Sequence, residues 1–204
     1  MSHRIAKTLV VAFALVLGSR AEAQGALPPA VPANLQVPPG INAFLKGHAA
    51  GTQDYVCLPS GSGAAWTFFG PQATLFSDDA NQITTHFLSS NPYENDTPRA
   101  TWRDSRDTST IWALAVATST DRSYVAAGAI PWLLLQVVGA EEGPTRGQRL
   151  AGTVYIQRLN TAGGMAPTSG CASMADVGKK ALVPYSADYF FYRIELGRVG
   201  RDRH

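Results

Sequence analysis

Short apolar or alternating runs recur along the chain from about residue 41, each bounded by Gly, Pro, Asn, Asp or Ser. This pattern is typical of β-strands joined by tight turns. The segments expected to form strands are 43–50, 54–58, 66–69, 73–76, 82–88, 101–103, 110–118, 132–138, 152–159 and 188–195. Helical patterns are scarce, and the best candidate for a helical turn is the short stretch 172–177.

Three breaks between these runs carry turn chemistry. Gly51-Thr52 separates the first two expected strands, and 78–81 (Asp-Asp-Ala-Asn) predicts a turn. Gly70-Pro71 interrupts another apolar run, so the chain must turn or bulge there.

The pattern within three segments indicates how the strands are buried. Segment 132–138 is almost continuously apolar, which favours a strand buried on both faces, with a short buried helix as the alternative. In segment 152–159, Val154 and Ile156 point to one face and Thr153, Tyr155 and Gln157 to the other. Segment 188–195 is dense in aromatic residues, which we interpret as core, the alternative being a surface on which a sugar or another ligand stacks. Together these patterns predict an all-β fold, an antiparallel β-sandwich or a barrel-like single domain.

Both ends of the chain differ from this body. Arg4 and Lys7 precede an apolar run of 11 residues (8–18), and the segment 21–23 (Ala-Glu-Ala) is a small-x-small cleavage signal. The run is shorter than the roughly 20 residues that span a bilayer, so residues 1–23 predict a cleaved signal peptide and no transmembrane anchor. We therefore expect a secreted or periplasmic protein after cleavage near Ala23. Residues 24–40 form a proline-rich lead expected to be extended and weakly packed, residues 41–196 the β-rich domain, and residues 197–204 a basic tail.

The charge balance argues against nucleic-acid binding, and the two cysteines predict a disulfide. The full chain has 17 basic and 15 acidic residues, and removal of residues 1–23 leaves 14 of each. A neutral mature protein lacks the basic face of a nucleic-acid binder. Cys57 and Cys171 would meet an oxidising compartment, which favours a disulfide between them.

Searches for catalytic motifs give mostly negative results. The segment 61–66 (Gly-Ser-Gly-Ala-Ala-Trp) lacks the third glycine of a dinucleotide fingerprint and lies between strands rather than in a βαβ unit. There is no phosphate-binding loop and no nucleophile elbow. His48 and His86 have no nearby cysteine or second histidine, so neither a metal site nor a cofactor is expected.

One constellation around His86 suggests a ligand site. In an extended strand, Gln82, Thr84 and His86 share one face, and the imidazole ends this row of hydrogen-bonding side chains. Trp102 could provide a stacking surface, and Asp104 or Asp107 could orient the imidazole for acid–base chemistry. The alternative is a solvated sheet face followed by an Asx-turn loop.

Several segments spread along the chain form a recognisable set. They are 44–49 (FLKGHA), 51–57 (GTQDYVC), 71–76 (PQATLF), 85–87 (THF), 98–102, 128–134 (GAIPWLL), 155–161 (YIQRLNT), 170–171 and 183–192. With these segments the sequence resembles an uncharacterised secreted family, domain of unknown function 3455. The resemblance implies export but no catalytic residues, since the family has no defined activity. Some relatives bear a malate dehydrogenase label, which this sequence does not support because it lacks a nucleotide-binding βαβ unit.

Three functions are compatible with these features. The first is an exported binding or surface-interaction module whose partner is a small molecule, a glycan or a surface component. The second is a secreted hydrolase or isomerase that uses His86 with Asp104 or Asp107. The third is a structural component of the envelope or wall. The absence of a recognisable catalytic set favours the first.

Overall fold

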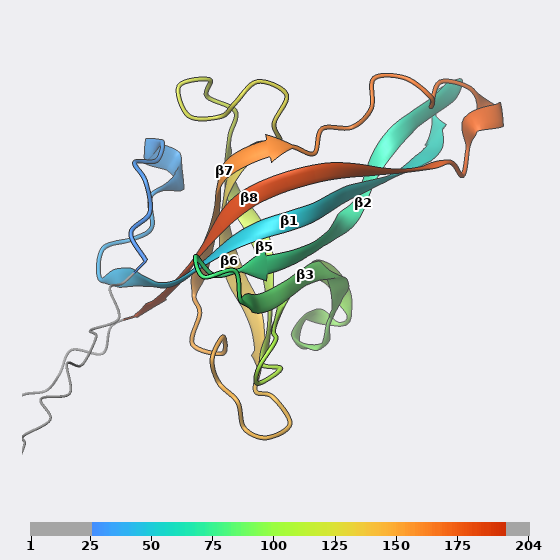
Figure 1. Cartoon of the computed structure of the whole chain (residues 1–204). Coiled ribbons are helices and arrows are strands. Elements are labelled where there is room, and N and C mark those ends of the chain that lie inside the picture. Colours follow the sequence, from blue (N-terminus) through green and yellow to red (C-terminus); the bar gives the residue numbers. More distant parts are fainter. Residues whose placement is uncertain (1–25, 195–204) are drawn as a thin grey trace, which may run out of the picture.

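Eight antiparallel strands make up the fold, and the computed structural model describes residues 26–194 (Figure 1). The strands are β1 (Ile41–Ser60), β2 (Gly63–Phe76), β3 (Gln82–Asn91), β4 (Thr97–Asp104), β5 (Thr110–Ser119), β6 (Trp132–Glu141), β7 (Tyr155–Gly163) and β8 (Lys180–Ile194). Each strand pairs with its neighbours in sequence, and β8 pairs with β1 to close a barrel. The all-β antiparallel prediction is confirmed, and the chain adopts the barrel form.

The remaining elements within residues 26–194 are three short 3₁₀ helices, η1 (Ala33–Leu35), η2 (Pro92–Glu94) and η3 (Met174–Asp176). The last of them lies within the expected helical turn at 172–177. None of the helices in this part of the chain has the length and hydrophobicity needed to cross a bilayer. The expected signal peptide (1–23) and basic tail (197–204) lie outside the described residues. Of the proline-rich lead (24–40), residues 26–40 are described.

The prediction of two separate strands around Gly51 is wrong, because β1 runs through this position without a break. A Cβ atom at Gly51 would lie 2.0 Å from the carbonyl oxygen of Gln72. Glycine therefore marks a close approach of β1 and β2 rather than a turn. Of the turn or bulge expected at Gly70-Pro71, the chain forms a bulge, because pairing passes from Asp54–Gly70 to Tyr55–Phe68 and leaves one extra residue in β2. The separate strands expected at 66–69 and 73–76 are therefore parts of the single strand β2.

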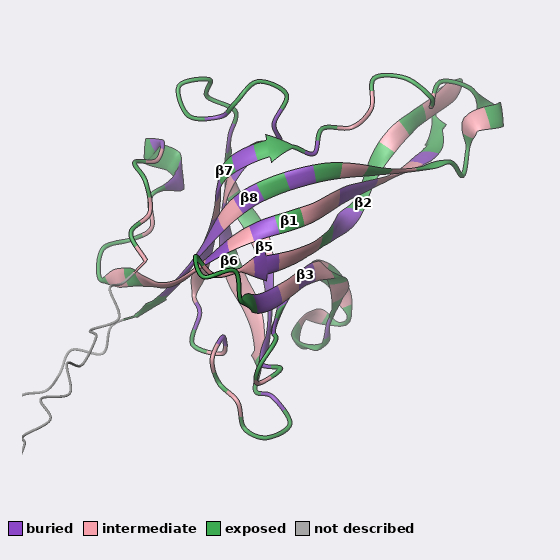
Figure 2. Cartoon of the chain, in the orientation of Figure 1, coloured by how far each residue is buried: buried purple, intermediate pink, exposed green. Residues whose placement is uncertain are grey.

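Apolar side chains fill the barrel and also cover part of its outside. The inner cluster includes Leu75, Trp102, Leu135, Tyr189 and Phe191. The outer cluster lies on β6, β7 and β8 and contains Trp132, Leu134, Leu159, Phe190 and Tyr192. Strand β6 therefore contributes buried residues to both faces, as its continuous apolar sequence predicts. Figure 2 shows buried and exposed residues alternating along several strands.

The proline-rich lead is packed against the outer cluster, so the expectation of weak packing is wrong for this segment. Leu35 is fully buried there, and its carbonyl oxygen accepts a hydrogen bond of 2.6 Å from Nε2 of Gln157. Asn34 donates a second hydrogen bond, of 2.8 Å, to the carbonyl of Thr118. The aliphatic residues of the lead replace water over an apolar part of the sheet, which stabilises the contact.

The predicted disulfide is confirmed, with the Cα atoms of Cys57 and Cys171 5.6 Å apart. In Figure 1, β1 and β2 extend beyond the rest of the barrel, and η3 lies at the end of this arm. Cys57 also donates its amide to the carbonyl of Lys179 and accepts from the amide of Gly178. The bond therefore fastens the loop that precedes β8 to the arm.

Candidate functional site

A cavity of about 410 Å³ lies within the barrel, and every strand contributes to its wall. This volume is within the usual range for sites that bind small molecules. The cavity is lined by Gln53, Phe68, Pro71, His86, Leu88, Pro98, Arg99, Ala100, Trp102, Ala113, Leu114, Ala115, Leu133, Leu135, Arg158 and Tyr189. Most of these side chains are apolar, and a small number of polar groups interrupt them.

The cavity opens where β2 departs from β3. These two strands pair only between residues 73–76 and 82–86, so the earlier part of β2 is free to follow β1 into the arm. Phe68 and Leu88 line this part of the cavity. Phe68 is 50% exposed and Leu88 is 37% exposed. The mouth is therefore apolar.

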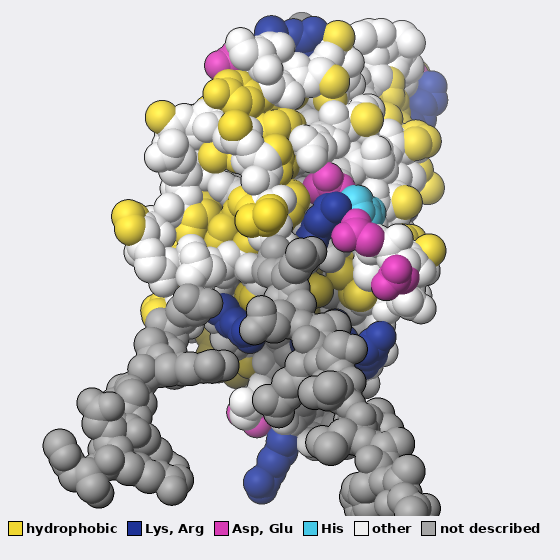
Figure 3. Space-filling view, turned by 60° about the vertical axis from the view of Figure 1, so that its left-hand side comes forward, with side chains coloured by type: hydrophobic (Ala, Val, Ile, Leu, Met, Phe, Trp, Pro, Cys, Tyr) yellow, Lys and Arg dark blue, Asp and Glu magenta, His cyan; other side chains and the backbone are white. Residues whose placement is uncertain are grey.

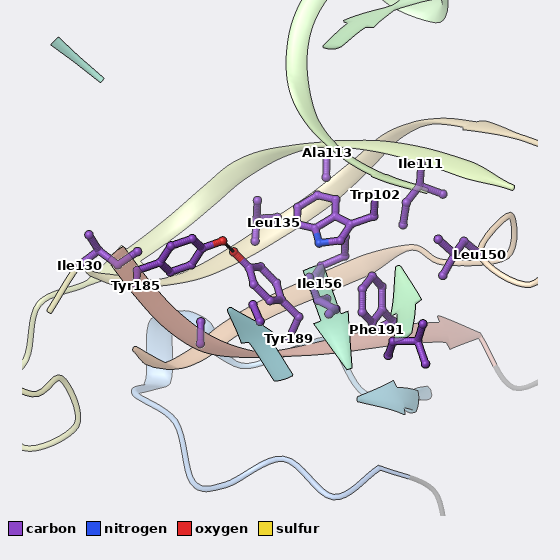
Figure 4. Packing of buried hydrophobic residues seen from close by; sticks show 14 residues of the cluster. Trp102, Ile111, Ala113, Ile130, Leu135, Leu150, Ile156, Tyr185, Tyr189 and Phe191 are labelled. Carbon is purple, nitrogen blue, oxygen red and sulfur yellow. Dashed lines mark hydrogen bonds between the residues drawn. The ribbon is translucent and has the colours of Figure 1, made fainter. Parts of the chain in front are cut away.

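His86 and Trp102 are cross-strand partners of β3 and β4 that form one wall of the cavity. Their rings stack with centroids 4.1 Å apart and planes inclined by 11°. Tyr189 of β8 meets both rings edge-on. Figure 4 shows Trp102, Tyr189 and Tyr185 in succession along the barrel interior, with the two tyrosine hydroxyls 3.3 Å apart. Aromatic contacts of this kind hold the wall rigidly.

The His86 imidazole is neutral. Burial lowers its pKa to about 3, although a hydrogen bond to the Thr101 carbonyl opposes this change. Nδ1 lies 2.9 Å from that carbonyl oxygen, which can only accept, so Nδ1 carries the proton. Nε2 is then the unprotonated nitrogen and a hydrogen-bond acceptor.

Three hydrogen-bond donors of the wall meet no acceptor at full hydrogen-bond geometry among the described residues, although Gln53 lies beside the Tyr185 hydroxyl and Arg158 beside the Tyr189 hydroxyl. They are Nε2 of Gln53, Nε1 of Trp102 and Nε of Arg158. Gln53 is 3% exposed and Trp102 is fully buried. A buried donor without an acceptor costs about 1–3 kcal/mol, so such groups call for an explanation.

Arg158 supplies the charge nearest to this cluster. Its Nη2 donates a hydrogen bond of 2.8 Å to the carbonyl of Pro131, and it forms no ion pair with any carboxylate in residues 26–194. The positive charge of Arg158 affects the pKa values of His86, Tyr185 and Tyr189. Burial raises the pKa of Tyr189, and the Arg158 charge opposes the increase.

A family model for proteins of unknown function, DUF3455, matches residues 38–193 and so includes all eight strands almost completely. The chain belongs to this family. No curated protein and no solved structure matches it. The DUF3455 match thus covers every residue of the cavity wall without assigning a role to any of them.

The barrel of this DUF3455 protein brings together His86 and Trp102 but not the whole expected row. Gln82 is exposed, and its amide bonds to Ser105 Oγ at 3.0 Å. Thr84 is buried next to His86 along the strand but does not line the cavity. Its hydroxyl has no partner among the described residues.

Asp104 and Asp107 shape a loop and do not line the cavity. Oδ1 of Asp104 accepts from the amides of Arg106 and Asp107, and its Oδ2 lies 3.5 Å from Nε of Arg149. Asp107 accepts from the amide and hydroxyl of Ser109 and from the amide of Arg149. No hydrogen bond joins either carboxylate to the His86 ring, whose bonded partner is the Thr101 carbonyl.

Sequence reasoning missed Gln53, Arg158 and Tyr189 as parts of the site. Arg158 did carry a signal, because a period of two puts it on the same face as the apolar Ile156. A charged residue on an apolar strand face is unusual enough to single out. Gln53 and Tyr189 had no comparable signal, since their position depends on how β1 and β8 close the barrel.

A larger hollow, of about 730 Å³, lies between the lead and the outer sheet face. Gln36 and Asn42 line its exposed side, and its two buried polar side chains already bind each other, because the Tyr192 hydroxyl donates to Oε1 of Gln157. Nε2 of Gln157 is bonded to Leu35, so this amide has both ends satisfied. The hollow therefore lacks the unpartnered donors found inside the barrel.

The other described histidine, His48, has a side chain that is 42% exposed. Figure 3 shows a histidine side chain on the surface among acidic and basic side chains. Nδ1 of His48 is 2.6 Å from Asp188 and Nε2 is 2.6 Å from Asp78, which also pairs with Lys46. Both ring nitrogens are thus engaged, and residues 26–194 hold no group of side chains suited to a metal ion. This cluster ties β1 to β8 and to the turn after β2.

Proposed function

We propose that the protein is an exported binding module that holds a small amphipathic molecule inside its barrel. The observation that carries this proposal is the cavity of about 410 Å³, whose apolar wall contains a few unpartnered polar groups. Concave sites of this composition are typical of small-molecule binding. The buried stack of His86 and Trp102 would form a rigid part of the wall against which the apolar part of the ligand packs.

The chemistry of His86 favours binding over acid–base catalysis. A general base works best when its pKa is near the working pH, and burial lowers the pKa of His86 to about 3. The aspartates that could have raised it serve the 104–109 loop instead. His86 is accordingly assigned as a hydrogen-bond acceptor and stacking group for the ligand.

Export is part of the proposal. The predicted signal peptide at residues 1–23 would direct the chain out of the cytoplasm. The disulfide between Cys57 and Cys171 is compatible with an extracellular or periplasmic location, since disulfides persist in oxidising compartments.

A fluorescence titration with the neutral apolar probe N-phenyl-1-naphthylamine tests the binding site. Saturable enhancement is expected for the unmodified protein. Ala100→Phe should weaken the apparent affinity by at least roughly tenfold, because the added ring occupies cavity space. Ala65→Phe is the matched control, since Ala65 is exposed on β2 and outside the cavity wall.

Circular dichroism and thermal unfolding must show that both variants keep the fold. Absence of saturable binding to the unmodified protein would reject the proposal. Equal loss of binding in the two variants would also reject it, because the probe would then not report on the barrel interior.

A further inference from the structure

We infer that the ligand of the barrel cavity is an organic anion, with one carboxylate-like group at Arg158 and an apolar body against His86 and Trp102. This inference rests on the proposed binding function and specifies the chemical class of the ligand. Its basis is the Arg158 guanidinium, which lines the cavity without a carboxylate partner among the described residues, together with two buried donors of the same wall, Gln53 Nε2 and Trp102 Nε1.

These donors call for acceptor atoms on the ligand. The indole and guanidinium groups can donate but cannot accept hydrogen bonds. Gln53 and Trp102 are almost completely removed from bulk water, so they gain most from an acceptor within the cavity. A carboxylate has two oxygens and can accept several such bonds at once.

Arg158 determines the charge of the ligand. The part of the chain that the structure describes provides no carboxylate to pair with it, and its Nη2 donates to the neutral carbonyl of Pro131. A cation in an apolar wall is stabilised by an opposite charge at short range. The second cation of the wall, Arg99, is already paired with Glu94 at 2.8 Å. One uncompensated charge therefore matches a monoanion better than a multiply charged phosphate.

The rest of the cavity wall is apolar and suits the apolar body of the ligand. Ala113, Leu133 and Leu135 line it, together with the stacked His86 and Trp102 rings. A molecule with an aromatic or aliphatic body and a terminal carboxylate would satisfy both halves of the site. A polar sugar would leave the apolar half without a partner.

Isothermal titration calorimetry with two matched probes tests this inference. The probes are 2-naphthoate, an anion at neutral pH, and 2-naphthamide, its neutral counterpart of nearly equal shape. We expect the unmodified protein to bind 2-naphthoate at least roughly tenfold more tightly, as for a hydrogen-bonded charge pair. This comparison uses the unmodified protein alone, so it does not depend on whether a variant folds.

Variants then locate the preference. Arg158→Gln should reduce the affinity ratio of the two probes to about one, and Arg158→Lys should retain part of it. Arg122→Gln is the control, since Arg122 is an exposed arginine that also donates to a backbone carbonyl. It should leave the ratio unchanged.

The two proposals fail in different ways. Equal binding of both probes, with no effect of Arg158→Gln, would overturn the anion inference and leave the binding cavity standing. Absence of binding for both probes and for N-phenyl-1-naphthylamine would overturn the binding function as well. An equal loss of preference in Arg122→Gln would show a general charge effect and would also overturn the inference.

Discussion

The imidazole of His86 lies flat against the indole of Trp102, 4.1 Å from centroid to centroid, and donates its Nδ1 proton to the Thr101 carbonyl. Both rings are almost completely buried. An imidazolium in this position would lose its hydration and gain no carboxylate partner. The stack therefore requires the neutral ring, which makes His86 a source of pH dependence.

Acid should destabilise the protein through His86. The ring titrates near pH 6.5 in the unfolded chain and near pH 3 in the folded one, so unfolding takes up a proton between these values. Stability should fall as the pH falls from 6.5 towards 3, by about 1.4 kcal/mol per pH unit from this residue alone. His86→Asn keeps a donor near the Nδ1 position and removes the titration.

Urea unfolding at several pH values between 4 and 7 measures this effect. The unmodified protein should lose stability more steeply than His86→Asn over this interval. The acidic groups with lowered pKa values, such as Glu94 and Asp107, contribute equally to both proteins. Parallel stability curves would contradict a neutral buried imidazole.

Gly51→Ala should disrupt the pairing of β1 with β2. The new Cβ would meet the Gln72 carbonyl at 2.0 Å and Cα of Ala73 at 2.5 Å, so the strands must separate. Steric overpacking of this kind costs about 1–3 kcal/mol. Gly152→Ala, where nothing lies within 4 Å, should change the free energy of unfolding by less than about 0.5 kcal/mol. Similar losses in the two variants would refute the close approach.

Removal of the disulfide should lower stability strongly while leaving the cavity intact. The cross-link joins residues 114 positions apart, for which the chain-entropy model gives about 4–5 kcal/mol. For a domain of this size, that corresponds to a Tm about 10–20 °C lower in the Cys57→Ala/Cys171→Ala double variant. Probe binding at room temperature should persist, because neither cysteine lines the cavity. An unchanged Tm would show that the bond does not restrain the unfolded chain.

Leu35→Ala tests whether the lead is an integral part of the fold. Leu35 is fully buried in the outer cluster, and truncation of a buried leucine costs about 2–5 kcal/mol. Leu27→Ala, at a position 89% exposed, should have almost no effect. Chemical denaturation of both variants measures the difference, and equal stabilities would mean that the lead detaches in solution.

Intact mass spectrometry of the protein recovered after export tests the predicted leader. Cleavage after Ala23 should give a mature chain that begins at Gln24. A product that retains residues 1–23 would contradict the signal peptide and with it the proposed location.

Much of the fold could be predicted from the sequence because period-two patterns report strand faces directly. The apolar run 132–138 identified a strand buried on both sides, and Gly70-Pro71 identified a bulge. Gly51 was misleading, because glycine is used both in turns and where backbones approach closely, and sequence does not separate these uses.

The candidate site could be predicted only in part. The alternation in 82–88 put His86 on one strand face with Gln82 and Thr84, and Trp102, the expected stacking partner, lies directly opposite His86 on β4. Asp104 and Asp107 seemed suitable partners for His86 because they follow Trp102 closely in the sequence. Their carboxylates instead accept hydrogen bonds from backbone amides of their own loop. Gln53, Arg158 and Tyr189 reach the cavity only through closure of β8 onto β1 and β7, a long-range event without a local signature.

A crystal structure of the protein with 2-naphthoate tests the central claim most directly. We expect the naphthalene ring to lie in the cavity beside His86 and Trp102, with its carboxylate within hydrogen-bond distance of Arg158. A probe bound only outside the barrel, or a cavity closed by its own side chains, would contradict it.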